Sequence, residues 1–200
     1  MLKKVLTVFL TLVALTLFAA SPQSLEIGAK APDFSLEGVD GKTYSLDSFD
    51  DAKVLVMVFT ANHCPTAQAY EDRLIDLARD YSSKNVAVLA ISPNDPRAVR
   101  LDELGYTDLG DDLKDMKLRA KEKKFNFPYL YDGETQRMSK AYGPVSTPHV
   151  FIFDQERILR YSGRIDDSEN PAKVTSRDAR NAIDALLAGK KVRVAKTKTF

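Results

Sequence analysis

The chain of 200 residues has little of the material from which metal and cofactor sites are built. Cys64 is its only cysteine, so no disulfide can form within the chain. Its two histidines, His63 and His149, lie far apart in the sequence and show no spacing typical of metal ligands. A glycine-rich phosphate loop is also missing. We therefore expect no metal and no cofactor, and a site made of His63, Cys64 and His149 is a weak alternative.

The charges nearly cancel. There are 29 basic and 28 acidic residues, which gives a formal net charge of +1. This balance predicts no general attraction to nucleic acid or to an anionic membrane. With 44% hydrophobic and 28% charged residues, the composition is that of a globular protein with one folded domain.

The first 22 residues differ from the rest of the chain. Lys3 and Lys4 precede an apolar run over residues 5–20, and small residues follow it. This order is typical of a secretory signal peptide, and the run is short for a bilayer, which takes ~20 residues. We predict a signal peptide over residues 1–22, export to the periplasm or medium, and no stable membrane insertion afterwards. A retained N-terminal helix is the alternative.

Alternating apolar patterns predict a mixed α/β domain. The run 54–60 is typical of a strand buried on both faces, and the helical spacing over 65–81 leads to a second such strand at 86–92. This order predicts a parallel pair with a right-handed crossover. We expect further strands at 33–36, 43–46, 129–131, 149–154 and 158–162, and helices at 115–124, 134–142 and 176–188.

Local signals mark the ends of some elements. The Asp40–Gly41 pair predicts a hairpin turn, Ser176 is the expected N-cap of the last helix, and Gly189 is its expected stop. Residues 190–200 form a basic C-terminal tail, which we expect to be solvated.

Cys64 lies where the strand 54–60 gives way to a helix, with Pro65 in the first helical turn. The positive end of the helix dipole favours a thiolate there, so Cys64 is a candidate nucleophile. The alternative is a small buried hydrophobe. His63 strengthens the first interpretation if its ring is protonated and turned toward the sulfur, whereas a solvent-facing ring would add nothing.

Three separated segments carry a family resemblance. Residues 59–65, FTANHCP, and the later Ser146-Thr147-Pro148 before a strand resemble the thioredoxin fold. Residues 27–34, IGAKAPDF, with 40–42, DGK, resemble the redoxin or AhpC/TSA branch of peroxiredoxin-like proteins. The Asn-His-Cys-Pro motif, with 70–73 and 163–167, is similar to an exported subgroup.

This resemblance implies a thioredoxin-like three-layer sandwich over residues 25–189, with a mixed central sheet, helices on both faces and an N-terminal β-hairpin. It implies that Cys64 is the nucleophile. It also places a cis peptide bond before Pro148, which leaves the Thr147 backbone to pair with an extended substrate. Pro65 and Arg164 complete the expected binding residues.

The chain departs from the family pattern around the thiol. Thioredoxins have a second cysteine where this chain has Ala67, and usually a tryptophan where it has His63. Peroxiredoxins have threonine or serine at the position of Ala61 and proline at that of Met57, so the usual peroxide-orienting groups are missing. Members of the subgroup often have a cysteine at Ala61, and we expect them to continue past Phe200 into Gly-Cys.

Three hypotheses follow. In the one we favour, Cys64 attacks a disulfide or hydroperoxide and is released by an external thiol or a thioredoxin-type reductant, as in a monothiol oxidoreductase or antioxidant. In the second, the domain is a redox-inert module that holds an extended peptide beside Pro148. In the third, Cys64 delivers a metal, but the paired cysteines of such proteins are absent.

Overall fold

The computed structural model describes residues 23–98 and 109–200. The predicted signal peptide, residues 1–22, lies outside the described residues. In the described ranges, no helix is both long enough and apolar enough to cross a membrane.

The centre of the fold is a strand with no exposed residue. Each side chain of β3 (Val54–Phe59) is buried. It pairs in parallel with β4 (Val86–Ser92), to which α1 (Pro65–Tyr81) connects it, and antiparallel with β6 (His149–Phe153). β5 (Tyr129–Tyr131) adds in parallel to β4. The apolar runs thus predicted these strands and the parallel crossover correctly.

Antiparallel strands complete the two edges of the sheet. β1 (Ser35–Gly38) and β2 (Thr43–Ser45) form the N-terminal hairpin, and β1 also pairs with β5. At the other side, β7 (Leu159–Gly163) pairs with β6. The seven-stranded order is β2-β1-β5-β4-β3-β6-β7, which confirms the mixed sheet.

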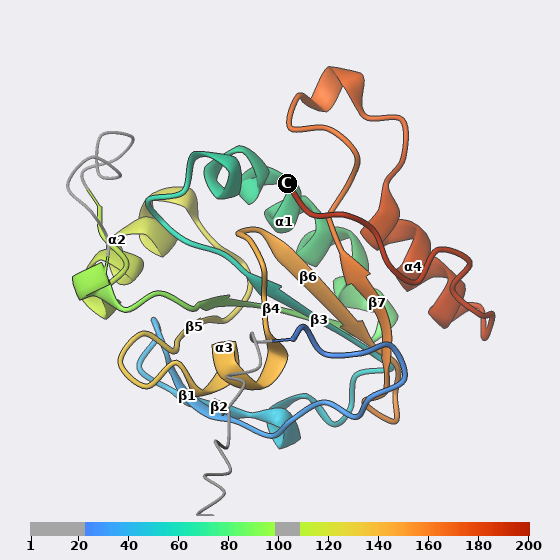
Figure 1. Ribbon diagram of the computed structural model, residues 1–200, viewed down its shortest axis with the longest axis horizontal. Helices are drawn as coiled ribbons and strands as arrows, with labels where there is room; N and C mark the ends of the chain where they lie inside the picture. Colours follow the sequence, from blue (N-terminus) through green and yellow to red (C-terminus); the bar gives the residue numbers. More distant parts are fainter. Residues whose placement is uncertain (1–22, 99–108) are drawn as a thin grey trace, which may run out of the picture.

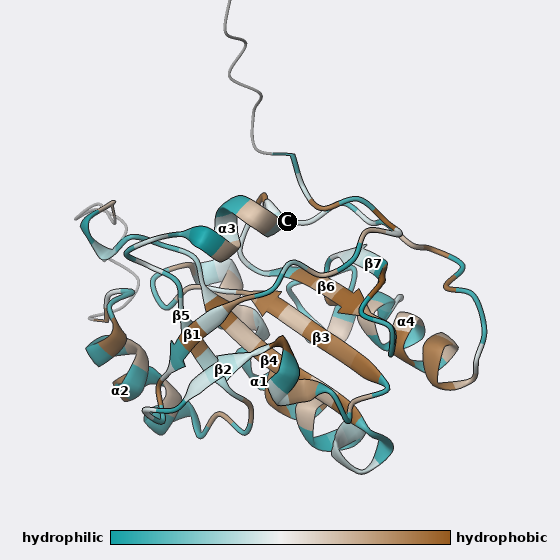
Figure 2. Cartoon of the chain, turned by 90° about the horizontal axis from the view of Figure 1, so that it is seen from below, coloured by the Kyte–Doolittle hydropathy of each residue, from teal (hydrophilic) through white to brown (hydrophobic). Residues whose placement is uncertain are grey.

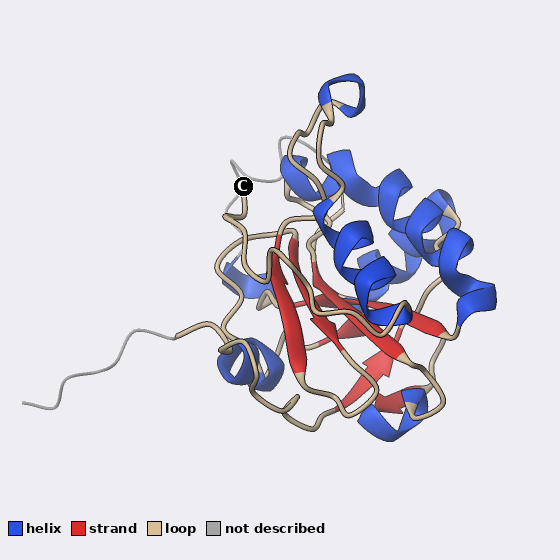
Figure 3. Ribbon diagram, turned by 90° about the vertical axis from the view of Figure 1, so that its right-hand side faces the viewer, coloured by secondary structure: helices blue, strands red, loops and turns tan. Residues whose placement is uncertain are grey.

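Helices cover both faces of this sheet (Figures 1 and 3). Alternate β3 side chains point to opposite faces, as the pleat requires. Val54, Val56 and Val58 belong to the apolar cluster that includes α1, α2 (Leu113–Lys123) and α4 (Asp178–Leu187). The residues between them join the other cluster, with α3 (Arg137–Tyr142) and the N-terminal segment. Figure 2 shows this apolar middle layer in brown between more polar helices, and the thioredoxin-like sandwich is confirmed.

The first residues of α4 and α2 differ from the prediction, because side-chain hydrogen bonds at these positions decide where each helix begins. α4 begins at Asp178 with Arg177 at the N-cap position, so the prediction of Ser176 as N-cap was wrong. The Ser176 hydroxyl instead donates to the Asp178 carboxylate at 2.6 Å. α2 starts two residues early because Asp112 accepts the Asp115 N–H at 2.8 Å.

The C-terminal tail packs along β7, although most of its residues are exposed to solvent as expected. Its residue Ala195 accepts the Ser162 N–H at 2.9 Å, and the Thr197 N–H donates back to Ser162 at 3.1 Å. The ring of Phe200 stacks on Tyr70 of α1, with 5.7 Å between centroids. The tail therefore covers the free edge of β7, whose backbone groups would otherwise lack partners.

Two glycines with positive φ allow a test of how the N-terminal segment packs on α3. Gly143 ends α3 at φ +59, and a Cβ there would lie 2.5 Å from the Gln23 carbonyl oxygen. Gly189 ends α4 at φ +65 with open space around it. We expect Gly189→Ala to lower the free energy of unfolding by about 1–2 kcal/mol, and Gly143→Ala to lower it further because backbone must also move. Denaturant unfolding of both variants measures this, and equal losses would contradict the packing of residue 23 on α3.

Candidate active site

The thiol stands at the junction of β3 and α1. Cys64 is the N-cap of α1, with extended backbone (φ −76, ψ 115), and Pro65 is the first helical residue. The Cys64 carbonyl accepts the Gln68 N–H at 3.0 Å, while its side chain makes no capping bond. Cys64 is half-buried and lies at the positive end of a helix of 17 residues.

The sheet register brings the second half of the site to the first. Phe59, the last residue of β3, pairs with His149, the first residue of β6. Because these strands are antiparallel, the residues after β3 and those before β6 meet at one edge of the sheet. Accordingly, Cys64 Sγ donates to the Thr147 carbonyl oxygen at 3.3 Å. The Thr147–Pro148 peptide bond is cis.

His63 faces the protein and not the solvent. Its side chain is only 16% exposed, and Nδ1 lies 2.6 Å from an oxygen of Asp111. The solvent-facing alternative is therefore wrong. The physical reason is the carboxylate of Asp111, which draws the ring toward the start of α2.

Asp111 is the residue that sequence reasoning missed. It has no exposed surface, and its carboxylate accepts the Asn62 N–H and the Asn94 side-chain amide, both at 2.7 Å, as well as His63. It lies 48 residues from His63, in a charged stretch with weak periodicity, so no local pattern points to the contact. The pair Asp111-Asp112 before a helix would have indicated only an N-cap.

Asn62 stabilises the turn before Cys64 through its side chain and its backbone carbonyl. Its side-chain amide donates to the Gly110 carbonyl at 2.6 Å, and its amide oxygen accepts from the Tyr129 hydroxyl at 3.1 Å. Burial raises the pKa of Tyr129 well above its usual value, so this hydroxyl stays a donor. The Gln68 side chain donates to the Asn62 carbonyl at 2.7 Å. The turn that presents Cys64 is therefore held by buried polar groups with partners.

His149 fixes the loop that carries Thr147. It is buried, with Nδ1 accepting the Val145 N–H at 3.2 Å and Nε2 3.0 Å from the Ser162 hydroxyl. Burial lowers its pKa to about 4, and the charge of Lys196 adds to this effect. His149 is thus a neutral structural group. Within residues 23–98 and 109–200, no three His, Cys, Asp or Glu side chains are placed to hold a metal ion.

Arg164 forms its contacts with α4 and the C-terminal tail. Its Nε donates to Asp178 at 2.7 Å, at the start of α4, and its backbone N–H donates to the Thr197 hydroxyl at 3.0 Å. These contacts join β7, α4 and the tail. They give Arg164 a structural role, and its assignment to substrate binding remains a prediction, as does that of the exposed Pro65.

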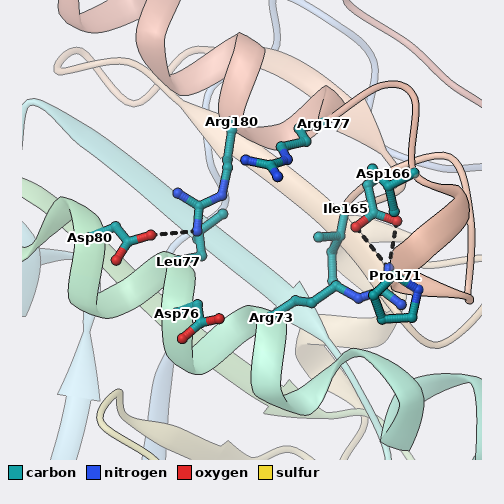
Figure 4. A pocket seen from close by; sticks show the side chains of 10 residues that line it. Arg73, Asp76, Leu77, Asp80, Ile165, Asp166, Pro171, Arg177 and Arg180 are labelled. Carbon is teal, nitrogen blue, oxygen red and sulfur yellow. Dashed lines mark hydrogen bonds and ion pairs between the residues drawn. The ribbon is translucent and has the colours of Figure 1, made fainter.

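Two cavities lie along α1 and around the loop before β6. A groove of about 410 Å³ is lined by Val145, Asn94 and Thr147, among others, and the carbonyl of Thr147 accepts from the Cys64 thiol. A second cavity of about 270 Å³ lies between α1 and α4 (Figure 4). There Arg73 pairs with Asp166 at 2.7 Å, and Arg180 with Asp80 at 2.8 Å.

The groove beside Thr147 is the better candidate for a substrate site. The Arg73 end of the second cavity lies about two and a half helical turns from Cys64, and most of its charges neutralise one another across the α1–α4 contact. We regard that cavity as part of the packing of α4.

Comparison with known proteins agrees with this geometry. The AhpC/TSA family matches residues 27–162. The chain belongs to the AhpC/TSA family. This AhpC/TSA protein is 28% identical over 172 residues to alkyl hydroperoxide reductase E of Mycobacterium tuberculosis, covering 82% of this chain and 97% of the relative.

Two further relatives extend the comparison. The thiol:disulfide interchange protein DsbE of Yersinia pestis is 27% identical over 141 residues, covering 70% of this AhpC/TSA chain and 64% of DsbE. The crystal structure of an uncharacterized conserved protein from Geobacillus kaustophilus is 37% identical, with a TM-score of 0.77, covering 87% of this chain and 88% of that one. The chain therefore stands among peroxiredoxin-like and thiol–disulfide oxidoreductase proteins.

The neutral state of His149 predicts acid sensitivity. Its pKa is about 4 when folded and 6.5 for the free side chain. Folding therefore opposes its protonation, and this contribution to stability is present above pH 6.5 and is lost as the pH falls toward 4. The loss is at most roughly 3 kcal/mol. We expect denaturant unfolding at pH 6.5 and pH 4 to show a smaller decrease for His149→Gln than for wild type, and an unchanged decrease would contradict the assignment.

Proposed function

We propose that this protein is an exported thiol oxidoreductase whose nucleophile is Cys64, the only cysteine of the chain. It reduces a disulfide or a hydroperoxide and is released by an external thiol or a thioredoxin-type reductant. The observation that carries the proposal is the position of the Cys64 sulfur at the start of α1, 3.3 Å from the carbonyl oxygen of Thr147, a residue that lines a groove of about 410 Å³.

The first step is an attack by the Cys64 thiolate. With a disulfide, the new S–S bond to Cys64 forms as the substrate S–S bond breaks, and the departing thiolate takes a proton. With a hydroperoxide, sulfur attacks oxygen, the O–O bond breaks, and Cys64 becomes a sulfenic acid while an alcohol or water leaves. External thiols then supply two electrons and return Cys64 to the thiol.

Ionisation of Cys64 also changes the hydrogen bonding of Thr147. The thiol hydrogen is the donor to the Thr147 carbonyl, so loss of that proton frees the carbonyl oxygen. An extended substrate then donates a backbone N–H to it. Thr147 therefore binds substrate in the state in which the sulfur is reactive.

The environment of the sulfur favours a disulfide substrate over a peroxide. Ala61 and Met57, at the positions of the usual peroxide-orienting residues, have no polar side-chain donor, and Met57 is buried in the sheet. Ala67, at the position of the second thioredoxin cysteine, is buried at 1% exposure. The mixed disulfide on Cys64 thus needs a thiol from another molecule.

Export is part of the proposal. Its support is the signal-peptide pattern over residues 1–22 and the similarity to a DsbE protein. An oxidising compartment supplies disulfides as substrates. There, a chain with one cysteine cannot close a disulfide on itself.

Replacing the sulfur tests the proposal directly. We expect Cys64→Ser to reduce turnover of oxidised glutathione, hydrogen peroxide and cumene hydroperoxide with added dithiothreitol to the uncatalysed background. Thr66→Ser, a conservative change in the same helical turn, is the control and keeps the wild-type rate. Thermal unfolding shows that both variants fold. Wild-type protein that reduces none of the three substrates but retains an extended peptide would favour the redox-inert binding module.

Restoring the second cysteine tests the monothiol step. Residues 64 and 67 are three apart, so they share one face at the start of α1. We expect Ala67→Cys to form an internal disulfide after attack and to release the first product without an external thiol. Mass spectrometry then finds a mixed disulfide with glutathione in wild type and an internal disulfide in the variant. A variant that retains glutathione to the wild-type extent would contradict this geometry.

A further inference from the structure

We infer that Asp111 is a positioning residue of the active site, which holds His63 so that its Nε2 delivers a proton to the thiolate that leaves the substrate disulfide when Cys64 attacks. The inference rests on the proposed function. Nothing in the family comparison assigns a role to this aspartate, and His63 replaces the tryptophan that usually precedes the thioredoxin nucleophile.

The first argument is burial. Asp111 has no exposed surface, and its carboxylate accepts from the Asn62 backbone, the Asn94 side chain and His63. Among these donors only His63 can carry a positive charge. A buried carboxylate is costly unless an opposite charge accompanies it. The pairing at 2.6 Å therefore stabilises the protonated ring, one residue before the nucleophile.

The second argument concerns which ring nitrogen exchanges its proton. A carboxylate only accepts hydrogen bonds, so the Nδ1 of His63 carries its proton toward Asp111 in both the charged and the neutral ring. Nε2 is then the nitrogen that gives up and regains a proton. Asp111 thus sets both the orientation of the ring and the identity of its acidic nitrogen.

The third argument is connection to the groove. The Asp111 oxygen that holds His63 also accepts the Asn94 amide, and Asn94 lines the groove beside Thr147. The other oxygen holds the backbone of Asn62, two residues before Cys64. One carboxylate therefore joins the histidine, the cysteine turn and a wall of the groove.

The chemical step balances without any further reagent. The Cys64 thiolate attacks one sulfur of the disulfide, the S–S bond breaks, and the departing thiolate takes the proton from Nε2. The products are a mixed disulfide on Cys64, a free thiol and a neutral His63. The next substrate cycle begins when His63 regains a proton from solvent.

Two disulfide substrates whose leaving thiolates differ in basicity distinguish a role of Asp111 in proton delivery from a purely structural role. Oxidised glutathione releases a basic thiolate that needs a proton, whereas 5,5′-dithiobis(2-nitrobenzoate) releases an acidic one that does not. We expect Asp111→Asn to slow the reaction of Cys64 with oxidised glutathione about 100-fold, the lower end of the range for general acid catalysis, and to leave the aromatic disulfide within about threefold. Equal slowing of both reactions would overturn the inference.

Asp115→Asn is the matched control. The Asp115 carboxylate accepts the Gly110 N–H at 2.7 Å, so it fastens the same loop through a backbone group. We expect this variant to react with both disulfides at the wild-type rate. A loss like that of Asp111→Asn would show that loosening of the loop explains the effect and would overturn the inference.

A double-mutant cycle tests whether Asp111 acts through His63. We expect His63→Gln to slow the glutathione reaction as Asp111→Asn does, and the double variant to be no slower than either. Additive losses would overturn the inference. The proposed function has a separate readout, because reaction with the aromatic disulfide requires only Cys64 and is lost in Cys64→Ser alone.

A measurement on wild type keeps the inference testable if Asp111→Asn does not fold. Nitrogen-15 NMR of the neutral His63 ring distinguishes its two tautomers. We expect the proton on Nδ1 and an unprotonated Nε2. The opposite tautomer would overturn the inference.

Discussion

The active site depends on a single buried carboxylate. After the Thr60 N–H, which donates to the Ile91 carbonyl of β4, the chain leaves the sheet, so the polar groups of the turn before α1 need other partners. Asp111 supplies them for the Asn62 N–H and for His63, and the Asn62 side chain closes the opposite side of the turn. The position of Cys64 follows, because the cysteine comes directly after these residues.

The remaining half of the site depends on strand register. The pairing of Phe59 with His149 places the ends of β3 and β6 side by side, and buried His149 then fixes the preceding loop through the Val145 N–H. The surroundings of the two histidines, His149 and His63, therefore differ. His149 is kept neutral among apolar residues, whereas His63 is given a carboxylate partner, and only the second arrangement suits proton transfer.

The chain has the fold of the AhpC/TSA family but differs from the family pattern in the residues around its thiol. The family supplies the sandwich and the corner at which the thiol stands. The usual partners of that thiol are absent, since Ala61 and Ala67 offer no hydrogen-bonding side chain. The His63–Asp111 pair lies in the same turn and places an imidazole ring and a carboxylate beside the cysteine instead.

Short-range patterns in the sequence predict the local elements. Continuous apolar runs predict the central strands, helical spacing predicts the α1 crossover, and the Asp40–Gly41 pair predicts the β1–β2 hairpin, while the boundary between strand and helix patterns places Cys64 at a helix start. The contacts of Asp111 with His63, of Arg164 with Asp178, and of residues 190–200 with β7 are visible only in the folded chain. These contacts join residues 14 to 48 positions apart or whole segments, and their formation depends on the packing of the chain around the sheet, which no local periodicity records.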